Sequence, residues 1–389
     1  MKKKIAILGA TGSIGTQTLS IISQFPNLFS VTLLTCNNQF EKLIDLSLPY
    51  KCQLGIHDQK TKHNVTSNYS FLFGNKNITS FLINNPPDIL VFAVNSVDSF
   101  TILKEVYPVC KKIAISSKEI LVLAGISGLL KQISKKARLL PLDSEHVAVH
   151  ELVRTIKQSQ IKKIILTASG GPFYRKDKKI DFTEITPEIA LKHPTWQMGK
   201  KVSIDSATLV NKGIELMEAK YLFDLPCSKL DVVIHPESII HSFCELTDGS
   251  IICQLAYPNM ELPIAYSLFF PKRKTVPTVK KFNFDHFPNL TFRKVSAREL
   301  PAINLAFDCM REGGFKEIQY LIADELAIGL FFQRRINFQQ IVPLIENVIN
   351  FQEKNILFNP DNILEHYTDL KKMINSKVDI LIKKQGRFL

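Results

Sequence analysis

Residues 1–15 of the chain read MKKKIAILGATGSIG. An apolar segment, residues 5–8, runs directly into glycines at positions 9, 12 and 15, and a helical pattern follows. Glycines at this spacing allow a tight turn and let a pyrophosphate approach the N-terminus of the helix. The stretch therefore predicts a dinucleotide-binding turn, although a sharp strand-to-helix turn without a ligand has the same pattern.

Strand and helix patterns alternate through the first 140 residues. This alternation predicts an α/β protein whose N-terminal part is a Rossmann-like, doubly wound parallel sheet. The expected strands there are residues 5–8, 31–35, 89–94, 113–116 and 139–142. Further strands are expected at residues 163–167, 231–235 and 250–255, and helical patterns dominate from about residue 298 onward.

The length of 389 residues predicts several domains. We expect a dinucleotide-binding domain over residues 1–142, a central α/β catalytic domain over 143–270, a linker over 271–297 and a C-terminal helical domain over 298–389. A mobile lid loop is expected over residues 174–198, because its first half is charged and lacks apolar periodicity.

Composition narrows the possible partners. The net charge is +13, but the lysines occur as dispersed pairs without interleaved aromatic residues, so we expect no nucleic-acid partner. No signal segment and no apolar run long enough to span a membrane is seen, which predicts no membrane association. The seven cysteines are scattered and form no C-x-x-C pair, which favours a reducing, cytoplasmic location.

Two polar stretches carry the candidate chemistry: DSEH at 143–146 and HPTWQMGKKVSIDSATLVNKGIE at 193–215. Asp143 and Glu145 are two residues apart in a segment predicted to be extended, so their side chains should point to the same side. Two or three carboxylates suit an open site for a hard divalent cation, and Glu215 is the expected third ligand. Alone, an Asp-x-Glu pair is most often a solvated turn or a helix N-cap.

The second polar stretch predicts a helix from Ser206 onward. Asn211 and Glu215 should share a face of this helix with Thr208, and Lys212 is adjacent. A phosphate-binding role explains this mixture of amide, carboxylate, hydroxyl and lysine side chains better than a solvent-facing stripe does. The segment at 169–171, Ser-Gly-Gly after a strand, could also cradle a phosphate, or it could be a plain turn.

The residues after the second strand bear on the cofactor. Cys36, Asn37 and Asn38 include no acidic residue that would bind a ribose 2′-hydroxyl. Their chemistry therefore favours NADP over NAD.

With these residues in place, the sequence resembles the 1-deoxy-D-xylulose 5-phosphate reductoisomerase family. The matching motifs cover most of the chain in the order typical of the family. They are GATGSIG at 9–15, SKE at 117–119, LPLDSEHVAV at 140–149, LTASGGPF at 166–173, ALKHPTW at 190–196, IDSATLVNKGIE at 204–215, VVIHPESIIHS at 232–242 and DGS at 248–250.

The resemblance implies an enzyme, an NADP-dependent oxidoreductase of the non-mevalonate isoprenoid pathway. It would isomerise and reduce 1-deoxy-D-xylulose 5-phosphate to 2-C-methyl-D-erythritol 4-phosphate, using NADPH and either Mg²⁺ or Mn²⁺, and it would act as a homodimer. The implied metal ligands are Asp143, Glu145 and Glu215, which with Lys118 form the implied catalytic set.

The resemblance also assigns binding residues, with Trp196 as the lid residue that covers the substrate. The implied substrate-binding residues are Lys118, Ser144, Glu145, Ser169, His193, Trp196, Ser206, Asn211, Lys212 and Glu215. The implied cofactor-binding residues are Thr11, Gly12, Ser13, Ile14, Cys36, Asn37, Asn38, Ser117, Glu119 and Gly199.

Some positions depart from the family pattern. Those near the cofactor are Cys36, Asn37, Asn95, Asp98 and Ser117, and those that add negative charge elsewhere are Glu237 and Asp324.

Two rival functions remain. A semialdehyde-type dehydrogenase would need an activated cysteine, and no cysteine here lies in a recognisable nucleophile motif. A non-catalytic dinucleotide sensor would have no need for the three carboxylates.

Overall fold

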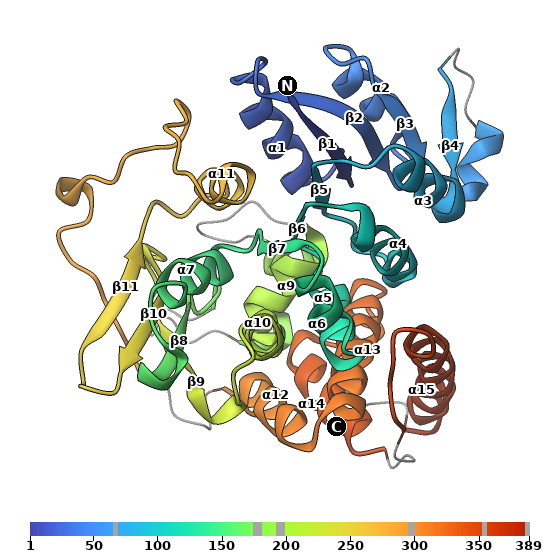
Figure 1. The fold of residues 1–389 in the computed structure, drawn as a ribbon. Helices are drawn as coiled ribbons and strands as arrows, with labels where there is room; N and C mark the ends of the chain where they lie inside the picture. Colours follow the sequence, from blue (N-terminus) through green and yellow to red (C-terminus); the bar gives the residue numbers. More distant parts are fainter. Residues whose placement is uncertain (65–68, 174–180, 192–198, 295–299, 352–355, 386–389) are drawn as a thin grey trace. The chain divides into compact units, whose positions relative to one another are not determined.

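The computed structural model describes residues 1–64, 69–173, 181–191, 199–294, 300–351 and 356–385, and Figure 1 shows the elements along the chain. The chain forms two compact units. The first comprises Met1–Ala124, Gly128–His150 and Asn259–Phe282, and the second comprises Gly125–Ser127, Glu151–Pro258 and Asn283–Leu389. The predicted four-part division, with boundaries at 142/143, 270/271 and 297/298, stays a prediction.

A parallel sheet is the centre of the first unit. Within the described residues it has seven strands in the order β4-β3-β2-β1-β5-β6-β7 (Figure 1). The strands are β1 (Lys3–Leu8), β2 (Phe29–Cys36), β3 (Gln53–Ile56), β4 (Phe71–Phe73), β5 (Ile89–Phe92), β6 (Lys112–Ile115) and β7 (Arg138–Pro141). The strand order reverses at β1, so the prediction of a doubly wound sheet is confirmed.

Two of these strands were absent from the sequence prediction. β3 and β4 have only four and three residues, too few for a strand pattern to stand out. β5 and β6 are apolar at nearly every position and buried throughout, as is typical of parallel strands covered on both faces. The sequence therefore identifies the central strands more readily than the short strands at one edge.

The helices that begin in the first unit either lie between these strands along the chain or follow the last strand. They are α1 (Ser13–Ser23), α2 (Phe40–Ser47), α3 (Gly74–Asn84), α4 (Phe100–Val106), α5 (Lys118–Ile126), α6 (Leu129–Ser134), α7 (Ser144–Val153) and α11 (Glu261–Phe269). α11 returns to this unit late in the chain, and the Phe269 ring lies 5.0 Å from that of Phe25. Buried Lys112 donates to three carbonyl oxygens at the end of α11, with Nζ–O distances of 2.9 to 3.1 Å.

The second unit contains a smaller mixed sheet in the order β11-β10-β8-β9. Its strands are β8 (Ile161–Ala168), β9 (Leu230–Ile234), β10 (Ile240–Leu246) and β11 (Ile251–Leu255). β8 and β9 are parallel, and β10 is antiparallel to both β8 and β11. β10 was not among the predicted strands, whereas the other three match their predictions to within a few residues.

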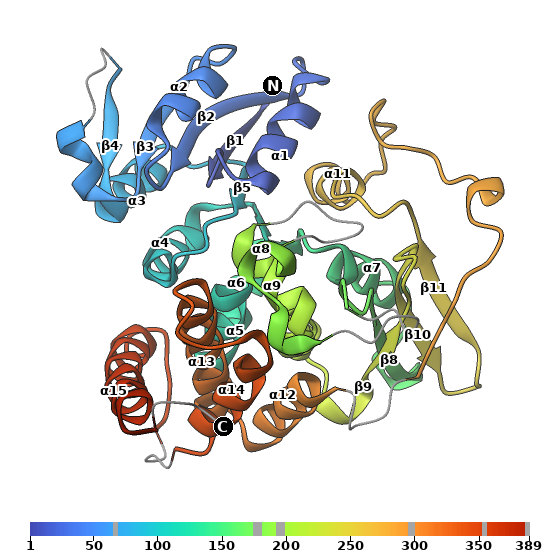
Figure 2. The same cartoon turned by 180° about the vertical axis from the view of Figure 1, so that it is seen from behind.

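The second unit also contains several helices, and the prediction of a helical C-terminal region is confirmed (Figure 2). They are α8 (Pro187–Ala190), α9 (Lys200–Thr208), α10 (Val210–Leu222), α12 (Pro301–Glu312), α13 (Gly314–Phe332), α14 (Ile341–Ile349) and α15 (Ile363–Gln385). α10 packs closely on α12 and α13. The evidence is at Gly213, where an added Cβ would lie 2.6 Å from Tyr320 Oη and 2.9 Å from Ala306 Cβ.

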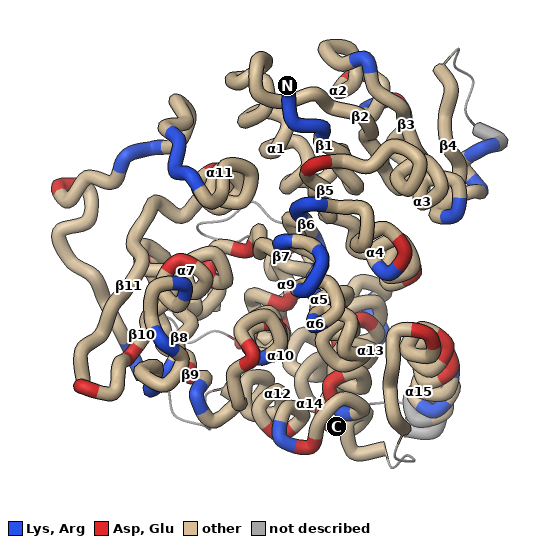
Figure 3. Tube along the Cα trace, in the orientation of Figure 1, with Lys and Arg blue, Asp and Glu red and all other residues tan. Residues whose placement is uncertain are grey.

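Lys and Arg are spread along the elements of both units, as Figure 3 shows.

Among the described residues, no helix has the length and apolar character needed to cross a membrane.

Candidate active site

The glycine turn joins β1 to α1 and closes tightly. Gly9 has φ 85°, and Gly12 N donates to Gly9 O at 3.1 Å. A Cβ at Gly9 would lie 2.2 Å from Ala93 O, and a Cβ at Gly15 would lie 2.4 Å from Gly9 O, so larger residues would push main-chain segments apart. In the described part of the chain no side chain caps the N-terminus of α1. A tight glycine turn that leads into an uncapped helix N-terminus is the arrangement that binds phosphate groups in nucleotide-binding folds.

The other predicted cofactor residues of the turn lie around this N-terminus. Thr11 is buried and its carbonyl oxygen accepts a hydrogen bond from Lys42 Nζ at 2.7 Å. Gly12 and Ser13 are exposed, and Ile14 is half-buried. The two exposed residues are the ones open to a ligand from solvent.

The end of the second strand presents two kinds of residue. Asn37 and Asn38 are exposed, whereas the Cys36 side chain belongs to the apolar core, where burial raises the pKa of its thiol to about 12. A cofactor contact from Cys36 would have to come from its main chain. The two asparagines can offer neutral donors.

Ser117, Lys118 and Glu119 follow β6. The Ser117 side chain is buried and donates to Val94 O at 2.5 Å, so it supports the main chain after β5. Lys118 and Glu119 begin α5. Lys118 Nζ lies 2.7 Å from Asp143 Oδ2, which joins the end of β6 to the end of β7.

The prediction that Asp143 and Glu145 lie in an extended segment is wrong. β7 ends at Pro141 and α7 begins at Ser144, so Glu145 lies in the first turn of a helix. Glu145 N donates to Asp143 Oδ1 at 3.1 Å, and Val147 N donates to Asp143 O at 2.9 Å, which is N-cap geometry. The alternation expected of a strand fails here because the chain has already turned into the helix.

The neighbours of Asp143 keep its carboxylate ionised. Burial would raise the pKa of Asp143, but Lys118 and His146 outweigh burial and hold this pKa well below its usual range. His146 Nδ1 lies 3.3 Å from Asp143 Oδ1. Beside them, Ser144 Oγ donates to Glu145 Oε2. An ionised carboxylate is the form that a divalent cation binds.

In the second unit, the segment after β8 forms a loop of two left-handed glycines. Gly170 has φ 83° and Gly171 has φ 71°, and Gly171 N donates to Ser169 Oγ at 3.2 Å. A Cβ at Gly171 would lie 2.8 Å from Ser206 O, so the loop contacts α9 directly. The loop thus places Ser169 beside the segment that carries Ser206.

The helix predicted from Ser206 onward is in fact two helices. α9 begins earlier, at Lys200, and the chain breaks at Leu209, which has φ 64° and separates α9 from α10. The apolar spacing continues across this break, so periodicity alone could not reveal it.

The break also changes which residues share a face. Thr208 belongs to α9, where its hydroxyl donates to Ile204 O at 3.0 Å. The prediction that Thr208 shares a helix face with Asn211 and Glu215 is therefore wrong, because these two residues belong to α10.

Three predicted residues do meet on the first turns of α10. Lys212 Nζ donates to Glu215 Oε2, and Asn211 Nδ2 donates to Glu215 Oε1. Lys212 and Glu215 are 4% and 2% exposed, so this charge pair is almost fully removed from water. Breaking such a pair is costly, because the remaining charge stays buried.

A second lysine, which the sequence did not single out, bridges two buried carboxylates. Lys201 Nζ lies 2.9 Å from Asp205 Oδ2 and also forms an ion pair with Asp324. The added charge of Asp324 therefore has a cation beside it, and the bridge ties α9 to α13. The sequence signal was available, since Lys201 and Asp205 are four residues apart.

The remaining predicted site residues are placed only in part. His193, Trp196 and most of the expected lid over 174–198 lie outside the described residues. Gly199 is exposed at the N-cap of α9.

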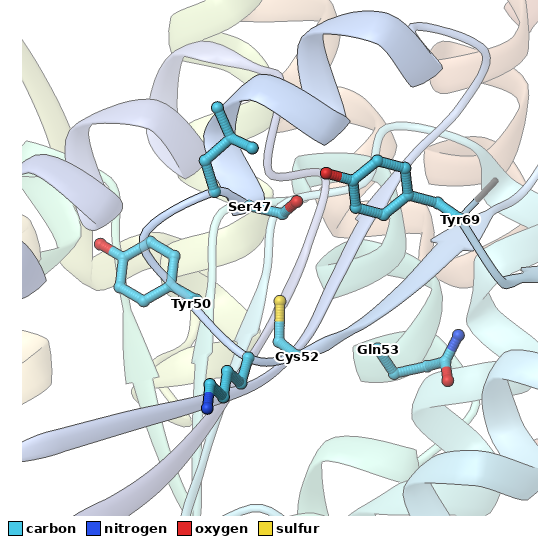
Figure 4. Close-up of a pocket in the computed structure, with 7 residues that line it drawn as sticks. Ser47, Tyr50, Cys52, Gln53 and Tyr69 are labelled. Carbon is cyan, nitrogen blue, oxygen red and sulfur yellow. The ribbon is translucent and has the colours of Figure 1, made fainter. Parts of the chain in front are cut away.

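A pocket of about 440 Å³ lies in the first unit (Figure 4). Its lining includes Tyr50, Cys52, Gln53 and Tyr69, which precede β3 and β4 or begin β3. It is therefore at the amino ends of the strands, whereas the glycine turn follows a carboxyl end.

Comparison with known proteins places these residues in a family. The model described as 1-deoxy-D-xylulose 5-phosphate reductoisomerase matches residues 5–125. The models described as the C-terminal domain of 1-deoxy-D-xylulose 5-phosphate reductoisomerase and as the DXP reductoisomerase C-terminal domain match residues 139–223 and 255–375.

Relatives that match over nearly their whole length carry the same family name. The 1-deoxy-D-xylulose 5-phosphate reductoisomerase of Thermoanaerobacter sp. (strain X514) is 38% identical, with 96% of this chain and 99% of the relative covered. The enzyme of the same name from Caldanaerobacter subterraneus subsp. tengcongensis is 39% identical at the same coverage. The chain belongs to the 1-deoxy-D-xylulose 5-phosphate reductoisomerase family.

Solved structures of the family share the fold. A DOX-P reductoisomerase in complex with NADPH, fosmidomycin and magnesium has a TM-score of 0.90 and 31% identity, with 99% of this chain and all of that chain covered. The Zymomonas mobilis enzyme in complex with NADPH has a TM-score of 0.87 and 29% identity, with 99% and 100% covered. The predicted family, fold and enzyme class, an NADPH-dependent oxidoreductase, are confirmed.

Proposed function

We propose that this chain converts 1-deoxy-D-xylulose 5-phosphate to 2-C-methyl-D-erythritol 4-phosphate, with NADPH as reductant and Mg²⁺ or Mn²⁺ as cofactor. The observation that carries the proposal is the buried Lys212–Glu215 pair on α10. It supplies a cation for a phosphate and a carboxylate for a metal within one turn of the same helix. Membership of the family supports the same assignment.

The donor set fits the metal. Asp143, Glu145 and Glu215 can each offer one carboxylate oxygen, the ligand type that Mg²⁺ and Mn²⁺ prefer. A bound cation would supply Lewis acidity toward the substrate carbonyl. Because Lys118 and His146 keep Asp143 ionised, this ligand is ready to bind near neutral pH.

The phosphate end of the substrate has a matching set of donors in the second unit. Ser169 and Ser206 come from the glycine loop and α9, and Asn211 and Lys212 come from α10. When Glu215 binds a cation, its charge no longer has to be balanced by Lys212 alone. The ammonium group can then turn its hydrogen bonds toward a phosphate, and such charge-assisted bonds are among the strong ones.

The glycine turn fits the dinucleotide. The close main-chain approach at Gly9 and Gly15 keeps the turn tight at the N-terminus of α1, and NADPH bound there would supply the hydride. Lys118, Ser144, His193 and Trp196 are proposed to contact the remainder of the substrate.

Burial argues against the dehydrogenase alternative. It raises the pKa of Cys110 to about 12, as it does for Cys36, and it also raises the pKa of Cys309. A thiol with a raised pKa is a poor nucleophile near neutral pH. These cysteines therefore lack the activation that a semialdehyde-type mechanism needs.

We also propose that the chain is a homodimer in the cytoplasm. β11 is an edge strand, and Ile251 and Ile252 on it are 57% and 41% exposed, which supports pairing with a second copy. The scattered cysteines support a reducing compartment. Light scattering during gel filtration tests the dimer, and cell fractionation tests the location.

NADPH consumption tests the function. The purified chain is expected to oxidise NADPH only when 1-deoxy-D-xylulose 5-phosphate and Mg²⁺ or Mn²⁺ are both present, and chelation should stop the reaction. Oxidation of NADPH without this substrate, or unchanged turnover after chelation, would contradict the proposal. Binding of NADPH without any turnover would favour the dinucleotide sensor.

A further inference from the structure

A chain of hydrogen bonds crosses the carboxyl edge of the parallel sheet in the first unit. Gly9 N donates to Thr35 Oγ1 at 3.1 Å, and Thr35 Oγ1 lies 2.7 Å from His57 Nε2. On the other side of the ring, His57 Nδ1 lies 2.8 Å from Asn75 Oδ1. This series of hydrogen bonds thus begins at the glycine turn after β1 and passes the ends of β2 and β3 to the first turn of α3.

The hydrogen bond that Asn75 donates at the end of this series determines which ring nitrogen of His57 carries a hydrogen. Asn75 Nδ2 donates to Asp98 O at 3.2 Å, which directs the amide oxygen of Asn75 toward His57. His57 Nδ1 must then carry a hydrogen, and Nε2 of the neutral ring is an acceptor. Nε2 takes the hydroxyl hydrogen of Thr35, whose oxygen is left to accept from Gly9 N. One neutral tautomer therefore satisfies every group in the chain.

The surroundings favour this neutral form. Burial lowers the pKa of His57, while its hydrogen bond to Asn75 raises the pKa by less. Thr35 is fully buried, so its hydroxyl needs a partner within the protein.

The main chain around His57 reaches the second strand as well. His57 N donates to Cys36 O at 2.9 Å, and Asp58 N donates to Asn37 O at 3.1 Å. The segment after β3 therefore holds both the glycine turn, through Thr35, and the strand end that carries Asn37. Dinucleotides bind at the carboxyl ends of parallel strands, where these two features lie.

We propose that His57, acting through Thr35 and held by Asn75, is a positioning residue for the dinucleotide. It does not contact the cofactor. It fixes the Gly9 amide and the main chain at Asn37, so that the turn and the strand end keep the spacing that NADPH needs. The inference rests on the proposed use of NADPH.

Four variants test this role. Thr35→Val removes the hydroxyl at nearly constant shape, and His57→Phe removes both ring nitrogens. Thr35→Ser keeps the hydroxyl, and Thr32→Val is the matched control, because Thr32 is on the same strand and its hydroxyl donates to Ile5 O at 3.2 Å, away from the turn. Direct titration of NADPH fluorescence gives the dissociation constant of each without turnover.

Thr35→Val and His57→Phe should each raise the NADPH dissociation constant about 5- to 30-fold, the effect of losing one buried hydrogen bond. Thr35→Ser and Thr32→Val should stay within about twofold of the unmodified chain. Unchanged affinity in a folded Thr35→Val or His57→Phe variant overturns the inference, and if one variant fails to fold the other decides.

Two further measurements distinguish a positioning role for His57 from a general loss of structure or activity in the variants. At saturating NADPH, kcat and the KM for 1-deoxy-D-xylulose 5-phosphate should be unchanged in Thr35→Val, and a parallel loss in both overturns the positioning role. In ¹⁵N spectra, the His57 ring, assigned by its loss in His57→Phe, should carry its hydrogen on Nδ1. The other tautomer overturns the proposed chain. If the unmodified chain does not bind NADPH at all, the proposed function fails first.

Discussion

Two regions of this molecule bring a lysine and a carboxylate together, and they do so in different ways. Lys118 and Asp143 follow β6 and β7, which are neighbours in the parallel sheet, so the strand order places them side by side. Lys212 and Glu215 are three residues apart in one helix, so the helical period places them together. The first pair depends on the sheet topology, and the second depends on where α10 begins.

The difference shows how each of the two pairs can be lost. A change that disturbs the sheet would separate Lys118 from Asp143, whereas the second pair would survive as long as α10 forms. Conversely, the direction of the second pair depends on the break at Leu209 and on the close packing at Gly213.

Removing one charge from the proposed metal ligands should have the largest effect. Asp143→Asn or Glu145→Gln should lower kcat by about 10²- to 10⁴-fold, because a cation that stabilises charge in the transition state is held less well. The NADPH dissociation constant should be nearly unchanged, since the glycine turn is not altered. Exposed Asp248→Asn, in a turn of the second unit, is the control. Near-normal turnover in Asp143→Asn or Glu145→Gln would refute the metal assignment.

Removing the lysine of the second pair should weaken substrate binding. Lys212→Ala should cost about 1.5 to 3 kcal/mol, measured as the substrate dissociation constant at saturating metal, because a charge-assisted hydrogen bond to phosphate is lost. Lys162→Ala is the control, since Lys162 is exposed and forms an ion pair with Glu245 at 2.7 Å.

A substrate analogue without its phosphate sharpens this test. Such an analogue never makes the bond to Lys212, so its affinity should fall much less in Lys212→Ala. An equal loss for substrate and analogue would show that Lys212 acts by stabilising α10 instead of binding phosphate.

A matched pair of glycines tests the packing that orients α10. Gly213→Ala should lower the free energy of unfolding by about 1 to 3 kcal/mol, because the new methyl group would overlap Tyr320 and Ala306. Gly329→Ala, in α13, has open space around the new Cβ and should raise stability by about 0.5 to 1 kcal/mol through helix propensity. Urea unfolding measures both. Equal effects of the two substitutions would mean that the contact at Gly213 does not constrain α10.

The sequence predicted the features that depend on local rules. The glycine turn and the central strands of the sheet follow from spacing and from continuous apolar runs, and the candidate site residues were proposed from motifs. The N-cap at Asp143 is local as well, and it was one of the alternatives that the Asp-x-Glu pair left open. Two features could not be predicted in this way. The left-handed Leu209 is a backbone angle that leaves the apolar period intact, and the bridge from Lys201 to Asp324 joins elements distant in the chain.

The cofactor region provides the smallest expected effect, because it offers neither a lysine nor a carboxylate where the second strand ends. Exposed Asn37 and Asn38 can donate hydrogen bonds to an adenosine phosphate but bring no charge. NADPH should therefore be preferred over NADH by only about 2- to 12-fold in kcat/KM, the range of one neutral hydrogen bond. Asn37→Asp should reverse the preference, since a carboxylate binds a free ribose hydroxyl and repels a phosphate. Steady-state kinetics with both cofactors would measure it, and equal kcat/KM values in the unmodified chain would refute the assignment of this strand end to the phosphate.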